Sequence, residues 1–148
     1  MTEILTDQEQ VMKGFISGVD CSQIVMEEFA PRLGINRVLA IKLAAAFGGG
    51  MWEGETCGAV IGALMAIGLK YGQSYNANQE QKELMLQKAD LFKKRFSEKY
   101  GSCTCKEILG YKIPEDLDTI IEEDLFKTKC ASLVVDACII CNEVMSEE

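Results

Sequence analysis

The apolar segment 57–72 constrains the fold of this chain more than any other part of its sequence. From Ala59 to Leu69 it is apolar almost all round a helix, whereas a helix at a protein surface keeps one polar side. The run is too short to cross a bilayer, and Glu53 and Glu55 block its extension upstream. Glycine and alanine recur along it, so that neighbouring helices can approach closely. We therefore expect the buried central helix of a bundle.

The rest of the chain also carries helical patterns and helix boundaries. Only two prolines occur, which favours uninterrupted helices. Apolar residues recur at helical spacing after three candidate N-caps, and the first of these opens a capping-box pattern with Glu9. The expected helices follow the caps Thr6, Asp20 and Asn36 and continue over residues 57–72, 76–100, 102–109 and 129–145. Because no segment shows strand alternation and no linker divides the chain, we expect an all-α fold, a single-domain helical bundle over residues 1–148.

Length and charge exclude several classes of partner. With 148 residues, 48% of them hydrophobic, the chain can bury one globular core. It has 15 Lys and Arg against 23 Asp and Glu, a formal net charge of −8, and no basic stripe. Nucleic acids and anionic membranes are bound by clusters of Lys and Arg, so the sequence argues against both. A partner protein with a positive face stays open.

The residues available for chemistry are cysteines. The chain has no histidine, which excludes every mechanism or metal site that uses an imidazole, and it has seven cysteines. The first dozen residues lack the pattern of a signal peptide, so we expect a cytoplasmic, reducing compartment in which thiols stay free or bind metal. An odd number of cysteines also fits poorly with a complete disulfide framework.

Four of the seven cysteines fall near the starts of expected helices. They are Cys21, Cys57, Cys105 and Cys130. A helix N-terminus carries a partial positive charge and free N–H groups, which should lower the pKa of a thiol and donate hydrogen bonds to sulfur. Such donors stabilise an anionic iron–sulfur cluster. The alternative is that these cysteines are small buried apolar residues, as free cysteine often is.

The other cysteines have weaker patterns. Cys138 and Cys141 form a C-x-x-C inside an expected helix, where core packing is a better explanation than a redox or ligand role. Cys103 precedes Cys105 by two residues and is interpreted as a bystander or a substitute ligand. The glycine run 48–50 lacks the sequence of a phosphate-binding loop, so we expect it to let the backbone approach something bulky, such as a cluster.

The stretch from Phe47 to Gly72, with Cys57-Gly58-Ala59-Val60-Ile61-Gly62 at its centre, resembles the signature of the C_GCAxxG_C_C family of small redox-active proteins. In this resemblance Cys21 matches the first family cysteine, Cys57 the cysteine of the central motif, Cys105 the third and Cys130 the fourth. The resemblance implies a helical protein that holds an iron–sulfur cluster through these four residues. Cys103, Cys138 and Cys141 depart from the family pattern.

Together these observations predict a redox-active protein that binds an iron–sulfur cluster through Cys21, Cys57, Cys105 and Cys130, for electron transfer or redox sensing. No substrate-processing residues are visible, so an electron carrier or redox accessory protein is favoured over an enzyme. Three alternatives stay open: a structural zinc site with four thiolates, a metal-free thiol–disulfide redox protein, and a helical interaction module whose cysteines only pack. The redox partner is not identified, and a homodimer formed through an apolar helix face also stays open.

Overall fold

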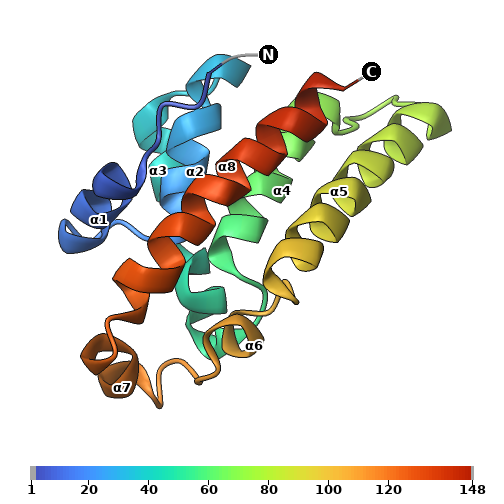
Figure 1. Ribbon diagram of the computed structural model, residues 1–148. Coiled ribbons are helices and arrows are strands. Elements are labelled where there is room, and N and C mark those ends of the chain that lie inside the picture. Colours follow the sequence, from blue (N-terminus) through green and yellow to red (C-terminus); the bar gives the residue numbers. More distant parts are fainter. Residues whose placement is uncertain (1–2, 148) are drawn as a thin grey trace.

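A computed structural model describes residues 3–147 and confirms the all-α fold (Figure 1). The helices are α1 (Gln8–Ile16), α2 (Cys21–Phe29), α3 (Arg37–Leu43), α4 (Gly58–Tyr71), α5 (Gln79–Tyr100), α6 (Cys105–Leu109), α7 (Leu117–Glu122) and α8 (Ala131–Ser146). Short helical turns η1 (Pro31–Leu33), η2 (Ala45–Phe47), η3 (Gly50–Gly54) and η4 (Phe126–Cys130) join some of them. Residues 3–147 contain no strand, and none of their helices is long and apolar enough to cross a membrane.

Polar side chains start the helices near their expected positions. The Asp20 backbone N–H donates to Gln23 Oε1 at 2.8 Å before α2, and the Leu39 N–H donates to Asn36 Oδ1 at 3.0 Å in α3. Helix α1 differs by one residue from the expected capping box, because Asp7 rather than Thr6 accepts the capping hydrogen bond. The Thr6 hydroxyl instead donates to a carboxylate of α2, which ties the start of the chain to the bundle.

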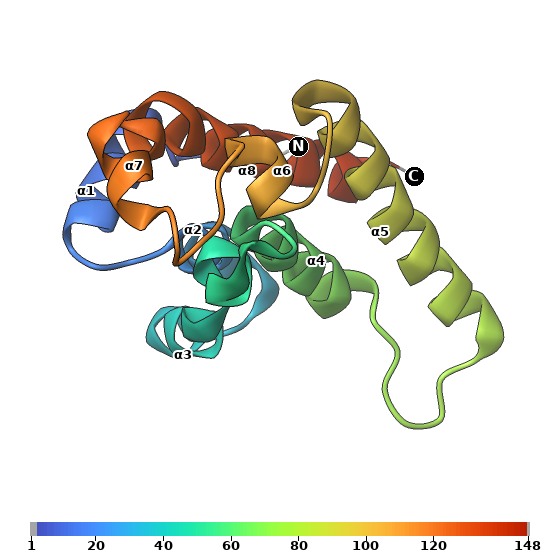
Figure 2. The ribbon, with the colours of Figure 1, turned by 90° about the horizontal axis from the view of Figure 1, so that it is seen from below.

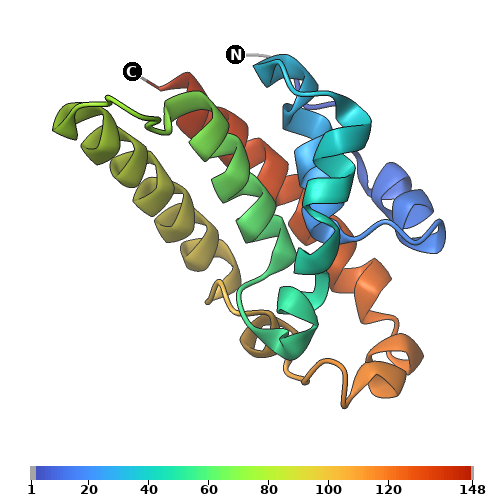
Figure 3. The same ribbon diagram turned by 180° about the vertical axis from the view of Figure 1, so that it is seen from behind.

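Helix α4 occupies the central position that its apolar sequence predicts. It packs against α2, α5 and α8, and Figure 3 shows it between α5 and α2. Val60, Ala63 and Ile67 of α4 are fully buried. Helices α2 and α8 bury an even larger share of their residues than α4 does. The core therefore lies among α2, α4 and α8, with α5 packed on its side.

Two glycines of α4 explain how closely α2 approaches it. A Cβ atom at Gly62 would lie 2.9 Å from the Ser22 carbonyl oxygen and 2.9 Å from Val25 Cβ. A Cβ atom at Gly58, one helical turn earlier, would lie 2.5 Å from Cys21 Sγ. Real Cβ atoms essentially never have contacts this short, so both positions require glycine while α2 stays where it is. The small residues expected to permit close packing therefore do so on the α2 side.

The starts of α2, α4 and α8 lie at the same end of the bundle, away from the two chain termini (Figure 1). Helices α6 and α7 and the turn η3 gather at this end, as the view from below shows (Figure 2). A cysteine stands at or next to the start of α2, α4, α6 and α8. The topology thus brings four separate segments, each with one cysteine, toward a common region.

Candidate functional site

Four cysteines from four segments line one cavity of about 210 Å³. They are Cys21, Cys57, Cys105 and Cys130, the four that the sequence analysis predicted as ligands. Most other walls of the cavity are apolar side chains, contributed by residues such as Phe15, Trp52, Ile113, Phe126 and Leu133. Asp20 adds a carboxyl group beside Cys21. The arrangement is a small apolar chamber whose reactive groups are thiols.

A short backbone pairing aligns Cys57 with Cys105. Thr56 and Thr104 form an isolated antiparallel bridge. On one side of it the Cys57 N–H donates to the Cys103 carbonyl at 2.7 Å, and on the other the Cys105 N–H donates to the Glu55 carbonyl at 2.6 Å. These bonds fix the two chain segments side by side, although they are far apart in sequence. The second and third cysteines of the cavity are therefore positioned by the main chain.

The glycines before α4 accommodate groups of the protein itself. A Cβ atom at Gly48 would lie 2.5 Å from Asp20 Cβ, and one at Gly50 would lie 2.5 Å from the Glu55 nitrogen. Gly49 lies under the indole of Trp52, whose Cε3 would be 3.2 Å from a Cβ atom there. The expectation of close approach holds for these glycines, and the neighbours described here are atoms of the protein. Only Gly49 of these three lines the cavity.

The pKa of each cavity thiol is raised above the ordinary value of cysteine, with burial as the largest cause. For Cys105 burial raises the pKa to about 12. At Cys57 burial comes first and the neighbouring Cys21 charge second, and together they outweigh the N–H groups of Val60 and Ala59, which favour the thiolate. The expectation that helix starts lower the pKa is therefore wrong for the free thiols, because the loss of solvent exceeds the effect of the helix N-terminus.

Cys130 differs from the other three in its local backbone. Its φ of −68° and ψ of −36° are helical, and η4 precedes it without a break. The Thr128 hydroxyl donates to the Asp124 carbonyl, and among residues 3–147 no side chain caps the start of α8. Cys130 thus lies within a continuous helical path, and its amide is not one of the free N–H groups of a helix start.

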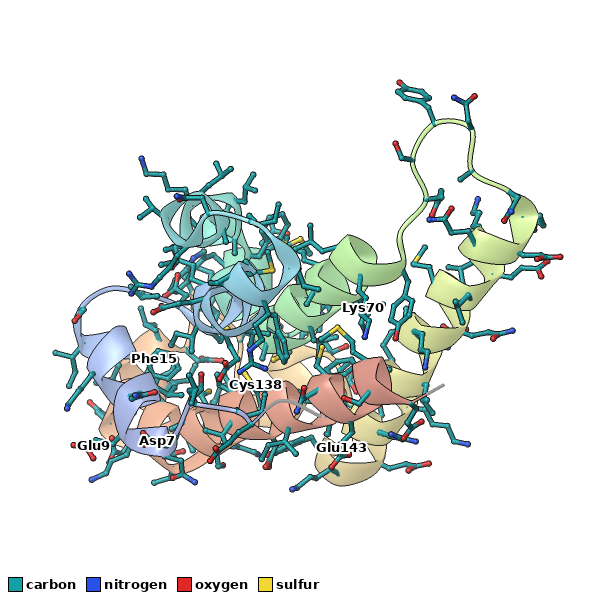
Figure 4. The ribbon with its side chains drawn as sticks, turned by 90° about the horizontal axis from the view of Figure 1, so that it is seen from above. Asp7, Glu9, Phe15, Lys70, Cys138 and Glu143 are labelled. Atoms are coloured by element: carbon teal, nitrogen blue, oxygen red, sulfur yellow. The ribbon has the colours of Figure 1, made fainter. Side chains whose placement is uncertain are left out.

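The remaining three cysteines lie outside the cavity. Cys103 Sγ is 3.2 Å from Ser97 Oγ on α5 and 3.7 Å from the Lys93 carbonyl oxygen. Cys138 and Cys141 are fully buried in the main core, where Figure 4 shows Cys138 on α8 among side chains of neighbouring helices. Cys141 Sγ lies 3.7 Å from the Ala63 carbonyl oxygen of α4. The in-helix C-x-x-C is therefore part of the packed core.

Different metal groups require different arrangements of sulfur ligands. Within residues 3–147 no three His, Cys, Asp or Glu side chains are gathered so as to hold a metal ion. A single zinc ion needs its sulfurs about 2.3 Å from one point, so a mononuclear site would require the cavity cysteines to move together. Iron–sulfur clusters use cysteine thiolates, commonly four of them, around a group of several atoms. In residue type and number, and in their placement around a cavity, the four cysteines fit that group.

The sequence analysis did not identify two residues at this site. The sequence indicates Asp20 only as a helix cap and assigns no role to Trp52, but both residues line the cavity. Trp52 is the one tryptophan of the chain and stands two residues after the glycine run 48–50, a pattern that could have marked it. Its contact with the cavity depends on the fold of η3, which local sequence patterns do not predict.

Comparison with known proteins gives one match. Residues 19–144 match the profile of the family described as "Putative redox-active protein (C_GCAxxG_C_C)". No curated protein and no solved structure matches the chain. The matched region includes the four cysteines that line the cavity and extends from before α2 almost to the end of α8. The chain therefore belongs to the C_GCAxxG_C_C family of redox-active proteins.

Proposed function

We propose that this protein holds an iron–sulfur cluster through Cys21, Cys57, Cys105 and Cys130 and works as an electron carrier or redox sensor. The observation that carries the proposal is the convergence of these four cysteines, from four separate segments, on one cavity. The other three cysteines serve as an internal comparison, because they lie outside it. Membership of a redox-active family supports the same class of function.

The surroundings of the cysteines suit a redox group. Buried apolar side chains such as Ile108, Ile113 and Leu133 exclude water from much of the cavity. The backbone N–H groups of Gly49 and Ser22 favour the charged form of Cys21, as those of Val60 and Ala59 do for Cys57. Hydrogen bonds to cysteine sulfur and the exclusion of water both tune the reduction potential of a cluster. When bound, the cluster would supply one-electron chemistry, while the protein supplies ligands and this shell.

Bound iron would also change the protonation state of the cavity thiols. Free thiols in this cavity hold their protons, because burial disfavours the thiolate. A metal coordinates the deprotonated sulfur, so metal binding would release protons and compensate the charge of the buried thiolates. We therefore expect binding of the cluster to stabilise the fold and to become stronger as the pH rises toward neutrality.

The deciding experiment is metal analysis of protein purified without oxygen. Iron, acid-labile sulfide and zinc are measured per chain, together with an electron paramagnetic resonance spectrum of the reduced protein. Stoichiometric iron and sulfide support the proposal. Zinc without sulfide would favour the structural zinc site instead. Protein that lacks metal but gains and loses two thiols reversibly would favour thiol–disulfide chemistry.

A pair of variants separates the cavity from the rest of the chain. Cys57→Ser removes a cavity thiol, whereas Cys141→Ala removes a buried thiol of the core that does not line the cavity. The proposal expects iron and sulfide to be lost from Cys57→Ser and kept by Cys141→Ala. Equal metal content in both variants, with both proteins folded, would contradict the proposed ligands.

A further inference from the structure

One residue of the cavity wall, Trp52, is more exposed to solvent than the other residues that line the cavity. Fifteen residues line the cavity, and Trp52 is the exposed one among them, with 41% of its surface accessible. The remaining lining residues are buried or half-buried. Trp52 therefore contacts both the cysteine cavity and solvent.

The backbone that carries Trp52 has an unusual conformation. Gly49, Gly50, Met51 and Trp52 have φ values of 58°, 64°, 60° and 55°, so four consecutive residues occupy the left-handed region. Only glycine adopts this region without strain, and other residues rarely follow one another there. Strain of this kind persists where the surrounding structure imposes it, and it is concentrated at functional sites.

The surroundings of the turn hold the indole over the cavity. Gly49 has no side chain, so the ring can lie against its backbone and beside Ile113, whose Cδ1 would be 3.5 Å from a Cβ atom at Gly49. The Glu55 N–H donates to the Gly50 carbonyl at 3.0 Å and closes the turn. Glu55 is bonded in turn to the Cys105 amide, and its carboxylate pairs with Lys106 at 3.7 Å. The base of the turn is therefore fixed to the segment that carries a cavity cysteine.

We infer that Trp52 is the lid of the cavity, and that its indole controls the access of water, dissolved oxidants and thiol reagents to the four cysteine sulfurs. The inference extends the proposed function and rests on it for the importance of the site, but the lid can be tested on metal-free protein. It makes Trp52 an access-controlling residue and assigns no ligand role to it.

Met51 offers a matched control for Trp52. The two residues are neighbours, each is 41% exposed, and each has a left-handed φ. Only Trp52 lines the cavity. In both alanine variants the substituted residue must still adopt a positive φ, so the backbone strain is the same in the two variants. A difference between Trp52→Ala and Met51→Ala therefore reports the contact of the indole with the cavity.

The test measures alkylation of individual cysteines by iodoacetamide in metal-free protein under reducing, mildly alkaline conditions, with peptides resolved by mass spectrometry. The readout is the labelling rate of Cys57, in the cavity, divided by that of Cys141, which is fully buried in the core. Trp52→Ala should raise this ratio by about tenfold or more, because reactivity follows access and thiolate character. Met51→Ala should leave it within about twofold, as for most surface substitutions.

An unchanged ratio in Trp52→Ala, or an equal rise in Met51→Ala, would overturn the inference. Both cysteines of Trp52→Ala would be labelled fast if that variant unfolds. In that case the ratio of the two labelling rates is measured in Trp52→Gly, and the same tenfold rise is expected, since glycine adopts the left-handed conformation without strain. Failure of the proposed function has a different signature, namely the absence of iron and sulfide from anaerobic protein. In loaded protein the lid further predicts that cluster absorbance decays faster in air for Trp52→Ala than for Met51→Ala.

Discussion

The Cys57 amide donates a hydrogen bond to the Cys103 carbonyl, with 2.7 Å between nitrogen and oxygen. Cys103 therefore contributes its main chain to the position of a cavity cysteine, while its sulfur lies against Ser97 of α5. Cys105, two residues later, contributes its main-chain N–H to the same pairing and its side chain to the cavity. Residues i and i+2 of an extended segment point to the same side. The side chains of Cys103 and Cys105 nevertheless lie in different places, because α6 begins at Cys105.

This division of roles predicts that Cys103→Ala keeps the cluster. The carbonyl that accepts from Cys57 belongs to the backbone and survives the substitution, and the lost Sγ contacts with α5 should cost about 1 kcal/mol or less of the free energy of unfolding. Cys105→Ala should instead lose iron and sulfide. Metal content per chain and urea unfolding measure the two effects. Loss of iron from Cys103→Ala would show that its sulfur is a ligand after all.

A second prediction covers the remaining cysteines. Cys21→Ser, Cys57→Ser and Cys130→Ser should each lose or badly destabilise the cluster, because serine is a poor replacement for a thiolate ligand. In the core, Cys138→Ala and Cys141→Ala should retain it and lose only about 1 kcal/mol of stability through a small cavity. Iron and sulfide content across these anaerobically prepared variants is the measurement. Retention by Cys21→Ser together with loss from Cys138→Ala would reverse the assignment.

The four cavity cysteines could be predicted because their positions depend on local sequence. Asp20 and the Gly101–Ser102 break mark helix starts, and the all-apolar run after Cys57 marks the central helix. Starts of parallel helices gather at one end of a bundle, so cysteines at or next to these starts come together there. The family resemblance selected the same residues.

Non-local features could not be predicted in this way. The pairing of residues 55–57 with 103–105 has no sequence signal, since it consists of main-chain hydrogen bonds between distant segments. The direction of the pKa shifts also depends on tertiary burial, which at Cys57 exceeds the local effect of the helix start. The place of Trp52 in the cavity wall likewise depends on a left-handed turn that sequence patterns do not anticipate in non-glycine residues.

The glycines of α4 give a third prediction, about stability. Gly62→Ala should destabilise the protein by about 1–2 kcal/mol, because the new methyl group must displace Ser22 or Val25 of α2, and this exceeds the gain in helix propensity. Gly68 is the matched control, since a Cβ atom there would meet nothing within 4 Å. Gly68→Ala should stabilise the protein by about 0.5–1 kcal/mol. Urea unfolding of both variants measures the difference, and equal effects would show that α2 does not pack on Gly62 this closely.

Gly58→Ala combines this packing effect with an effect on the site, which makes a fourth prediction. A Cβ atom there would overlap Cys21 Sγ, so the sulfur must leave its position against the start of α4. We expect this variant to lose iron and sulfide, whereas Gly62→Ala, one turn further along, keeps them if it is folded. Metal content of the two variants is the measurement. Full metal content in Gly58→Ala would show that Cys21 is free to bind from another position.

The last prediction concerns the stability of metal-free protein at alkaline pH. Burial raises the pKa of Cys141 to about 12, whereas a thiol in the unfolded chain titrates near 8.5. Between these values the unfolded chain releases a proton that the folded protein retains, so the free energy of unfolding falls as the pH rises, by up to about 1.4 kcal/mol per pH unit. The stabilisation is complete below the unfolded pKa and is lost progressively above it.

Cys141→Ala removes this contribution and leaves the other thiols in place. Its free energy of unfolding should differ from that of the wild type by a constant packing cost below a pH of about 8.5, and should then decline less steeply toward a pH of about 11. Urea unfolding at a series of pH values, with reductant and chelator present, compares the two slopes. Because the two proteins differ in one titrating group, parallel curves over the whole alkaline range would show that Cys141 ionises as readily in the core as in the unfolded chain.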